Sequence, residues 1–141
     1  MCLICDRIDM IKNGTNPYFV KELETGYVVI GDYQHFAGYS LFLFKEHQTE
    51  LFQLNKETKT KFLDEMSLVA EAVSKAFNCE KMNYELLGNG DSHLHWHLFP
   101  RITGDIEKID EYPIVPKAVK GILKQGEFPI HSINNDMKKE W

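Results

Sequence analysis

The feature that most constrains this chain is a run of three histidines that alternate with large apolar residues between positions 93 and 99, His-Leu-His-Trp-His-Leu-Phe. Alternation with a period of two is typical of a β-strand with one face in the core. The pattern predicts that the intervening apolar residues face the core, and that the imidazoles of His93, His95 and His97 share the opposite face.

The spacing of these histidines predicts a division of tasks among them. Alternate side chains on a strand are roughly 6.6 Å apart, which places His93 and His97 about 13 Å apart. Zinc binds imidazole nitrogen at about 2.0–2.1 Å, so one ion could be held by two neighbours but not by all three. A surface strand rich in histidine by chance is the alternative. Because three of the six histidines fall within five residues, we favour a functional site.

Length and composition predict one soluble domain spanning residues 1–141. The hydrophobic fraction of 43% and the charged fraction of 26% are ordinary for a globular protein. A net charge of -5 provides no overall basic field for nucleic acid. We find no signal-peptide pattern and no apolar stretch long enough to cross a membrane. Three cysteines without an export signal predict a cytoplasmic protein that has no structural disulfide.

The order of predicted elements is three strands, a long helix and a final hairpin. Strand-like runs cover residues 18–23, 27–30 and 39–44, and their short connections predict an antiparallel meander. Asn55 is a candidate N-cap, and apolar residues at helical spacing predict a helix that ends near Phe77. A fourth strand at residues 82–87 then turns into the histidine strand. The prediction is an α+β fold with a five-stranded antiparallel sheet and one long helix.

The pattern weakens after Arg101. Pro113 and Pro116 interrupt the chain, and residues 117–124 predict a short helix. We therefore divide the single domain into a core of about residues 1–101 and a C-terminal extension of residues 102–141.

Cys2 and Cys5 form a Cys-x-x-Cys pair, which is typical of a redox dithiol or of half a metal site. A redox pair is expected to open a helix after a strand, and no strand precedes this pair, so we favour a metal. A closed zinc site needs four ligands, so the other two must come from distant positions. His47, at the predicted end of a strand, is one candidate. The alternative is a pair of reduced, unliganded cysteines.

The histidine run resembles the signature of the histidine triad family. The order of elements is also similar to that family, and Cys2, Cys5 and the Lys45-Glu46-His47 segment resemble its zinc-binding bacterial members. The resemblance covers roughly residues 1–101. It implies a nucleotide-binding α+β fold that forms a homodimer through its helix and final strand.

The resemblance also implies a chemistry for each histidine. His95 would attack the α-phosphorus of a nucleotide, and His97 would donate a hydrogen bond to a phosphate oxygen as charge develops. Water would then release a nucleoside monophosphate, without a catalytic metal. In zinc-containing relatives the first histidine of the triad is a ligand, so the structural zinc site would comprise Cys2, Cys5, His47 and His93.

Several positions depart from the family pattern. The hairpin before the triad is short and carries Asp91, an unexpected negative charge near a phosphate site. Asn89 is the candidate amide donor and Ser92 the candidate hydroxyl for the phosphates and leaving group. Asp32 is the candidate carboxylate for the ribose, and Tyr39 replaces a histidine that many relatives carry.

The function that the resemblance implies is hydrolysis at the α-phosphate of a dinucleoside polyphosphate, such as diadenosine tetraphosphate, or of a nucleoside phosphoramidate. Pro100-Arg101 after the triad resembles the dinucleotide hydrolase branch, which we rank first. One alternative is a phosphorylase or nucleotidyltransferase. Another is a non-catalytic, zinc-containing nucleotide sensor. We expect a homodimer, because five strands and one helix leave an edge strand and apolar surface uncovered unless the C-terminal extension covers them.

Overall fold

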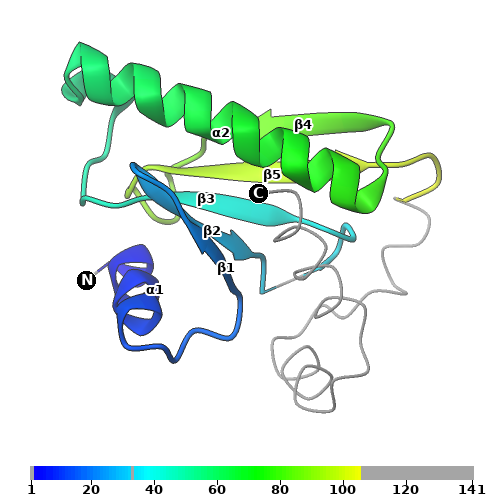
Figure 1. Ribbon diagram of the computed structural model, residues 1–141, viewed down its shortest axis with the longest axis horizontal. Helices are drawn as coiled ribbons and strands as arrows, with labels where there is room; N and C mark the ends of the chain where they lie inside the picture. Colours follow the sequence, from blue (N-terminus) through cyan, green and yellow to red (C-terminus); the bar gives the residue numbers. More distant parts are fainter. Residues whose placement is uncertain (1, 33, 106–141) are drawn as a thin grey trace.

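The computed structural model describes residues 2–32 and 34–105. The five strands form one antiparallel sheet in the order β1-β2-β3-β5-β4 (Figure 1). The predicted α+β class is therefore confirmed. The elements in chain order are α1 (Leu3–Lys12), β1 (Phe19–Glu22), β2 (Gly26–Ile30), β3 (Ser40–Phe44), the 3-10 helix η1 (Leu51–Gln53), α2 (Lys56–Phe77), β4 (Lys81–Glu85) and β5 (His95–Arg101).

The histidine strand β5 lies inside the sheet, between β3 and β4. β1, β2 and β3 pair in sequence order as the predicted meander, and β4 and β5 form the predicted hairpin. His97 lies opposite Leu41 on β3 and opposite Glu85 on β4. A central strand is hydrogen-bonded on both sides, so the backbone that carries His95 and His97 is held rigidly.

The long helix α2 covers one face of the sheet, as Figure 1 shows. The Asn55 side chain accepts a hydrogen bond from the amide of Thr58 at 2.8 Å, which confirms the predicted N-cap. Phe62 is fully buried, with its ring centroid 5.5 Å from that of Phe42 and 4.8 Å from that of Phe44. Burial of this apolar stripe, rather than helix propensity alone, stabilises α2.

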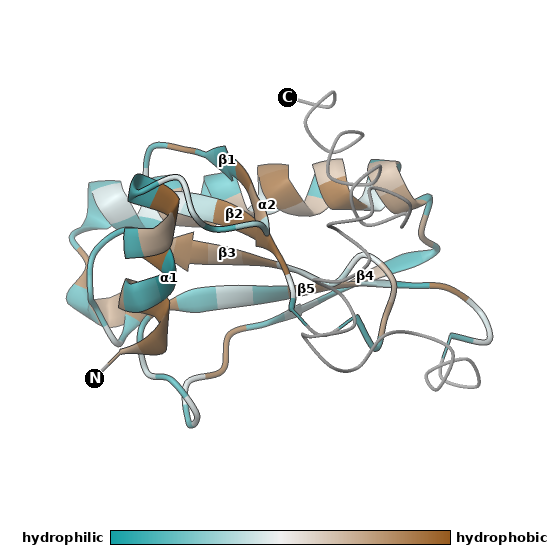
Figure 2. Ribbon diagram, turned by 90° about the horizontal axis from the view of Figure 1, so that it is seen from below, coloured by the Kyte–Doolittle hydropathy of each residue, from teal (hydrophilic) through white to brown (hydrophobic). Residues whose placement is uncertain are grey.

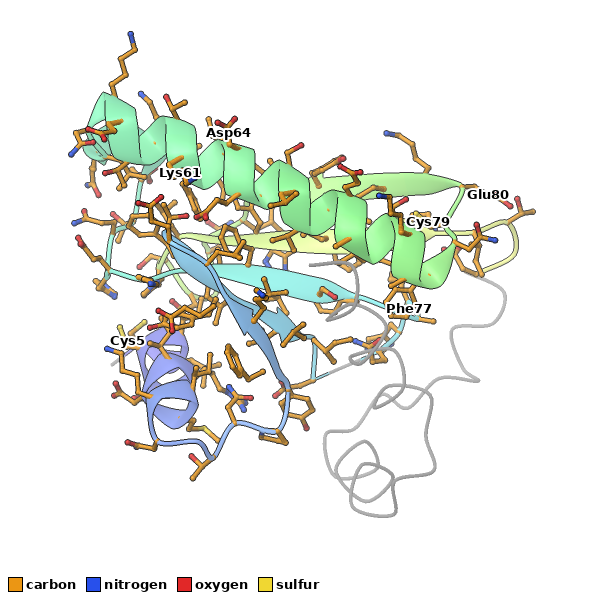
Figure 3. All side chains as sticks on the ribbon, in the orientation of Figure 1. Cys5, Lys61, Asp64, Phe77, Cys79 and Glu80 are labelled. Atoms are coloured by element: carbon orange, nitrogen blue, oxygen red, sulfur yellow. The ribbon has the colours of Figure 1, made fainter. Side chains whose placement is uncertain are left out.

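The helix α1 was not predicted from the sequence. The Cys2 side chain caps it by accepting a hydrogen bond from the Cys5 amide at 3.2 Å, and Ile4 and Ile8 are buried in the core. Figure 3 labels Cys5 at the start of this helix, on the opposite side of the sheet from Lys61 and Asp64 of α2. The cysteine pair therefore opens a helix.

The two faces of the histidine run differ less in solvent exposure than the alternation of apolar residues and histidines predicts. Leu94 and Leu98 are buried and Trp96 packs against the core, as predicted. However, His93 and His95 are also buried, and Cys2 and Cys5 at the start of α1 lie against the ring of His93. Figure 2 shows α1 in front of the mostly hydrophobic strands β2 and β3.

Some boundaries differ from those predicted. β5 begins at His95, so His93 precedes the strand, and β4 begins and ends earlier than residues 82–87. The helix predicted at residues 117–124 lies outside the described residues. Within the part of the chain that the structure describes, no helix has the length and apolar character needed to span a membrane.

Candidate active site and metal cluster

Four side chains that are distant in sequence converge beside the start of β5. Cys2 and Cys5 come from the start of α1, His47 follows β3, and His93 precedes β5. One donor atom from each lies within 4.8 Å of all the others. Nδ1 of His93 is 3.5 Å from the Sγ atoms of both cysteines, and Nδ1 of His47 is 3.5 Å from Sγ of Cys5. This is the predicted ligand set, and it could bind a metal ion.

The ring of His93 is held in its orientation by a backbone carbonyl. Its Nε2 is 2.7 Å from the carbonyl oxygen of Phe44, which can only accept a hydrogen bond. Nε2 must therefore carry the proton, which leaves the lone pair of Nδ1 directed at the cysteines. Burial lowers the pKa of His93, which favours the neutral form that binds metals.

Asp91 is part of the same region. Its carboxylate accepts hydrogen bonds from the amides of Ile4 at 3.2 Å and His93 at 3.0 Å, and it lies 3.7 Å from Sγ of Cys2. Burial alone raises the pKa of Asp91, but the bonds from the His93 and Ile4 amides outweigh it and the pKa is lowered. The negative charge that was unexpected from the sequence thus caps the N-terminus of α1.

His95 is buried, with 6% of its surface exposed. Its Nδ1 lies 2.5 Å from the carbonyl oxygen of His93. Because a carbonyl accepts and never donates, Nδ1 carries the proton and the lone pair belongs to Nε2. No other described residue forms a hydrogen bond with this Nε2. A neutral imidazole with an unprotonated Nε2 can act as a nucleophile.

His97 is the neighbour of His95 on the same face of β5. The two ring centroids are 4.6 Å apart with an interplanar angle of 67°. Burial, and then the charge of His95, lower the pKa of His97 to about 4, so its ring is neutral near pH 7. Nδ1 of His97 is 2.6 Å from the hydroxyl of Tyr39. This contact fixes the orientation of the ring.

A cavity of about 470 Å³ adjoins His97. Its walls are mostly apolar and aromatic, and Glu85 supplies the one carboxylate among the described lining residues. None of these residues is a lysine or an arginine. The cavity is lined by His35, Phe36, Tyr39, Glu85, Leu87, His97 and Phe99.

The other predicted substrate residues, Asp32, Asn89 and Ser92, do not line the cavity beside His97. Asp32 accepts a hydrogen bond from Nη2 of Arg7 at 2.8 Å. The pKa of Tyr39 is raised, first by burial and second by the negative charge of Asp32. Asn89 and Ser92 line a separate cavity of about 200 Å³, which shares only Leu87 with the cavity beside His97. Among the described residues, the charge of Asp32 therefore acts on Tyr39, but the predicted substrate residues do not all line one cavity.

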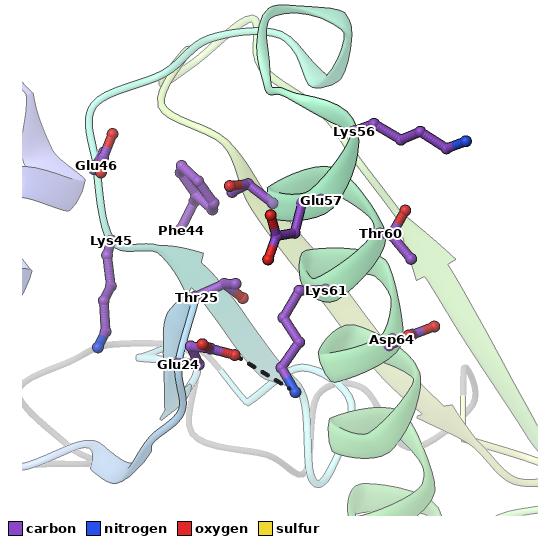
Figure 4. A pocket seen from close by; sticks show the side chains of 11 residues that line it. Glu24, Thr25, Phe44, Lys45, Glu46, Lys56, Glu57, Thr60, Lys61 and Asp64 are labelled. Carbon is purple, nitrogen blue, oxygen red and sulfur yellow. Dashed lines mark ion pairs between the residues drawn. The ribbon is translucent and has the colours of Figure 1, made fainter.

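A larger cavity of about 700 Å³ lies elsewhere, between the start of α2, the β1–β2 turn and the end of β3 (Figure 4). Its lining is dominated by charged side chains, including the ion pair between Lys61 and Glu24 at 3.5 Å. None of its lining residues is a histidine or a cysteine. We therefore place the candidate chemistry at the cavity beside His97, because the ring of His95 lies next to that of His97.

Sequence reasoning missed several contributions to this site. The carbonyl groups of Phe44 and His93 set the histidine tautomers, and backbone acceptors have no signature in the sequence. Glu85 was not selected, although its place opposite His97 follows from the hairpin register. Arg7 was not considered because the helix that carries it was not predicted.

The chain belongs to the HIT domain family. The model of that family, described as the HIT domain, matches residues 25–104, more than half of the 141 residues. The matched segment contains His47 and the whole histidine run. The family indicated by the sequence is thus confirmed.

Solved structures with similar folds support this assignment. A HIT-like protein from Bartonella henselae is 18% identical with a TM-score of 0.66, and the match covers 94% of this chain and 93% of that one. A hypothetical histidine triad nucleotide-binding protein from Sulfolobus tokodaii is 18% identical with a TM-score of 0.70, covering 96% and 91%. A HIT family protein from Bacillus anthracis is 21% identical with a TM-score of 0.62, covering 88% and 93%. At these identities the likeness shows the fold. No curated protein matches the chain.

Proposed function

We propose that the protein is a nucleotide hydrolase that acts at the α-phosphate through a covalent nucleotidyl-histidine intermediate. The substrate is a dinucleoside polyphosphate, such as diadenosine tetraphosphate, or a nucleoside phosphoramidate. The observation that carries the proposal is the hydrogen bond from Nδ1 of His95 to the His93 carbonyl, because it leaves Nε2 as the nucleophile.

In the first step the lone pair of His95 Nε2 attacks the α-phosphorus. A P–N bond forms, the bond from phosphorus to the leaving group breaks, and its electron pair departs with the leaving group, which takes up a proton from solvent when it is an amine. In the second step water attacks the same phosphorus, the P–N bond breaks, and its electron pair returns to Nε2. The protons of the attacking water end on the product phosphate and in solvent. The products are a nucleoside monophosphate and the released leaving group.

His97 stabilises the negative charge that develops on the phosphoryl oxygens. Its ring is neutral near pH 7 and lies beside that of His95, so one ring nitrogen can donate a hydrogen bond to a non-bridging oxygen. Asp32 is proposed to accept a hydrogen bond from a ribose hydroxyl. Asn89 and Ser92 are proposed to contact the phosphates or leaving group, which requires the short hairpin to approach His97 when substrate binds.

The metal cluster is proposed to hold zinc in a structural role. Two thiolates and two imidazoles form the donor set of a closed tetrahedral zinc site. When bound, zinc in such a shell supplies a cross-link and no open coordination position. Cys2 and Cys5 thereby fasten α1 to His93, whose carbonyl orients His95. We propose that the protein acts in the cytoplasm as a homodimer.

The cavity beside His97 favours one of the two substrate classes. Its described walls carry Glu85 and no basic residue, so an anionic polyphosphate leaving group would lack a counter-charge there. Arg101, which follows the triad, donates to both carboxylate oxygens of Asp105 instead. A phosphoramidate, whose leaving group is an amine, suits this cavity better. Phosphorolysis and nucleotide sensing without turnover are the remaining alternatives.

A panel of both substrate classes, incubated with the purified protein, tests the proposal. We expect a nucleoside monophosphate as product, and no turnover by His95→Ala. Omitting and adding inorganic phosphate separates hydrolysis from phosphorolysis. Binding of nucleotide without product formation by the native protein would instead support the sensor.

A further inference from the structure

We infer that Tyr39 is a positioning residue, which donates its hydroxyl proton to Nδ1 of His97 and thereby holds His97 in the tautomer with the proton on Nε2. The inference concerns the state of His97 in the free protein. Its consequence for catalysis rests on the proposed function.

The ring of Tyr39 occupies a position that the surrounding chain is built to accept. A Cβ atom at Gly31 would lie 2.3 Å from the ring, so only glycine permits this approach. The ring of Phe99 stacks on that of Tyr39 with centroids 4.4 Å apart and planes 6° from parallel. Nε2 of Gln34 donates to the Tyr39 carbonyl at 2.8 Å, which holds the backbone. These contacts direct the hydroxyl to His97 at 2.6 Å.

The protonation states of the two partners indicate which of them donates. Burial, followed by the charges of Asp32 and Glu85, raises the pKa of Tyr39, so the phenol keeps its proton. His97 is neutral near pH 7 and has one protonated and one unprotonated nitrogen. The hydrogen bond therefore joins two neutral groups. A phenol is the better donor of the two and an unprotonated imidazole nitrogen is the better acceptor.

The hydrogen-bond inventory points in the same direction. Among the described residues, Nδ1 of His97 is the one hydrogen-bond partner of the Tyr39 hydroxyl. If Nδ1 carried the proton and donated it, the hydroxyl proton would have no acceptor among these residues. Donation from Tyr39 satisfies both groups at once.

The tautomer decides what His97 can do for a phosphoryl group. With Nδ1 occupied as an acceptor, Nε2–H is a hydrogen-bond donor available to a phosphate oxygen. In the other tautomer Nε2 would present a lone pair, which repels that oxygen. Tyr39 thus acts through His97 and does not itself need to contact the reacting atoms.

Nitrogen-15 NMR of the full-length native protein with labelled histidine tests the inference without any substrate. We expect His97 near pH 7 to show a protonated Nε2 and an unprotonated, hydrogen-bonded Nδ1. Tyr39→Phe should move both shifts toward a mixture of tautomers. A protonated Nδ1 in the native protein would overturn the inference, whether or not the variant folds.

Kinetics provide the second readout. Tyr39→Phe should lower kcat by about tenfold to a hundredfold and change KM by less than about threefold, because the donor to the developing charge is lost. Tyr84→Phe is the matched control. Tyr84 is 48% exposed, and it lies on the face of β4 opposite to that of Glu85, the residue paired with His97. An unchanged kcat in Tyr39→Phe would overturn the catalytic consequence. Turnover that survives in His95→Ala would instead contradict the proposed function, and the NMR result would stand independently.

Discussion

Nδ1 of His95 donates to the carbonyl oxygen of His93 at 2.5 Å, so a residue of the candidate metal cluster also sets the tautomer of the candidate nucleophile. The His93 ring is held between the Phe44 carbonyl and the two cysteines. Any change that displaces His93 should therefore disturb His95 as well. The cluster and the candidate active site are coupled through a single backbone carbonyl.

The first prediction concerns metal content. Protein purified without chelators should carry about one zinc ion per chain, because the four side chains complete a closed shell. Cys5→Ser should lower both the zinc content and the melting temperature, by roughly 4 °C for each kcal/mol lost. Cys79→Ser is the control, since Cys79 pairs with Ser74 and lies outside the cluster. Elemental analysis that finds no zinc in the native protein would remove this site.

The second prediction concerns stability and pH. Burial, and then the charge of His95, lower the pKa of His97 from 6.5 to about 4 in the folded state. The unfolded state therefore binds more protons between these values, so stability is complete above pH 6.5 and declines as the pH falls to about 4. His97→Asn should reduce this decline. Denaturant unfolding at several pH values measures it, and an identical slope in the variant would contradict the assignment.

The third prediction concerns the leaving group. Glu85→Gln removes the one carboxylate from the described walls of the cavity beside His97. We expect kcat/KM for a dinucleoside polyphosphate to rise by about threefold to tenfold relative to that for a phosphoramidate, because a like-charge repulsion is lost. Glu71→Gln, on the exposed surface of α2, is the control. An unchanged ratio of the two kcat/KM values would show that Glu85 does not select the leaving group.

The fourth prediction is a homodimer. β4 is an edge strand of the sheet, and large apolar side chains near it and on α2 are exposed, including Leu68 at 50% and Leu87 at 59%. A two-fold partner would cover both surfaces. Sedimentation at micromolar concentration should give about twice the chain mass of 16.4 kDa. A mass near that of one chain would show that this surface does not dimerise, and Leu68→Glu should weaken a true dimer.

The sequence was sufficient to predict the sheet and α2, and its resemblance to the histidine triad family indicated the four residues that lie together in the cluster. The alternation around Trp96 and the helical stripe of α2 are local patterns, and each repeats often enough to be recognised. Helix α1 was missed because only two of its residues, Ile4 and Ile8, are buried, and two positions are too few to form a recognisable helical pattern. The contacts of His93 with Cys2 and Cys5 depend on the position of that missed helix.

The tautomers of the histidines could not be predicted from the sequence. They depend on backbone carbonyls and on the hydroxyl of Tyr39, which approaches His97 because residue 31 is a glycine. Such contacts arise only when distant segments are brought together. Sequence patterns identify which side chains are available for chemistry, whereas tertiary packing determines the protonation state in which each is held.

The most direct test of the account is to trap the intermediate. Substrate labelled at the α-phosphate is mixed with the native protein, quenched within milliseconds in alkaline denaturant, and the labelled peptide is identified by mass spectrometry. We expect the label on His95, no label in His95→Ala, and nucleotide binding by that variant within about tenfold of native. Full turnover by His95→Ala, or a label on another residue, would contradict covalent catalysis by His95.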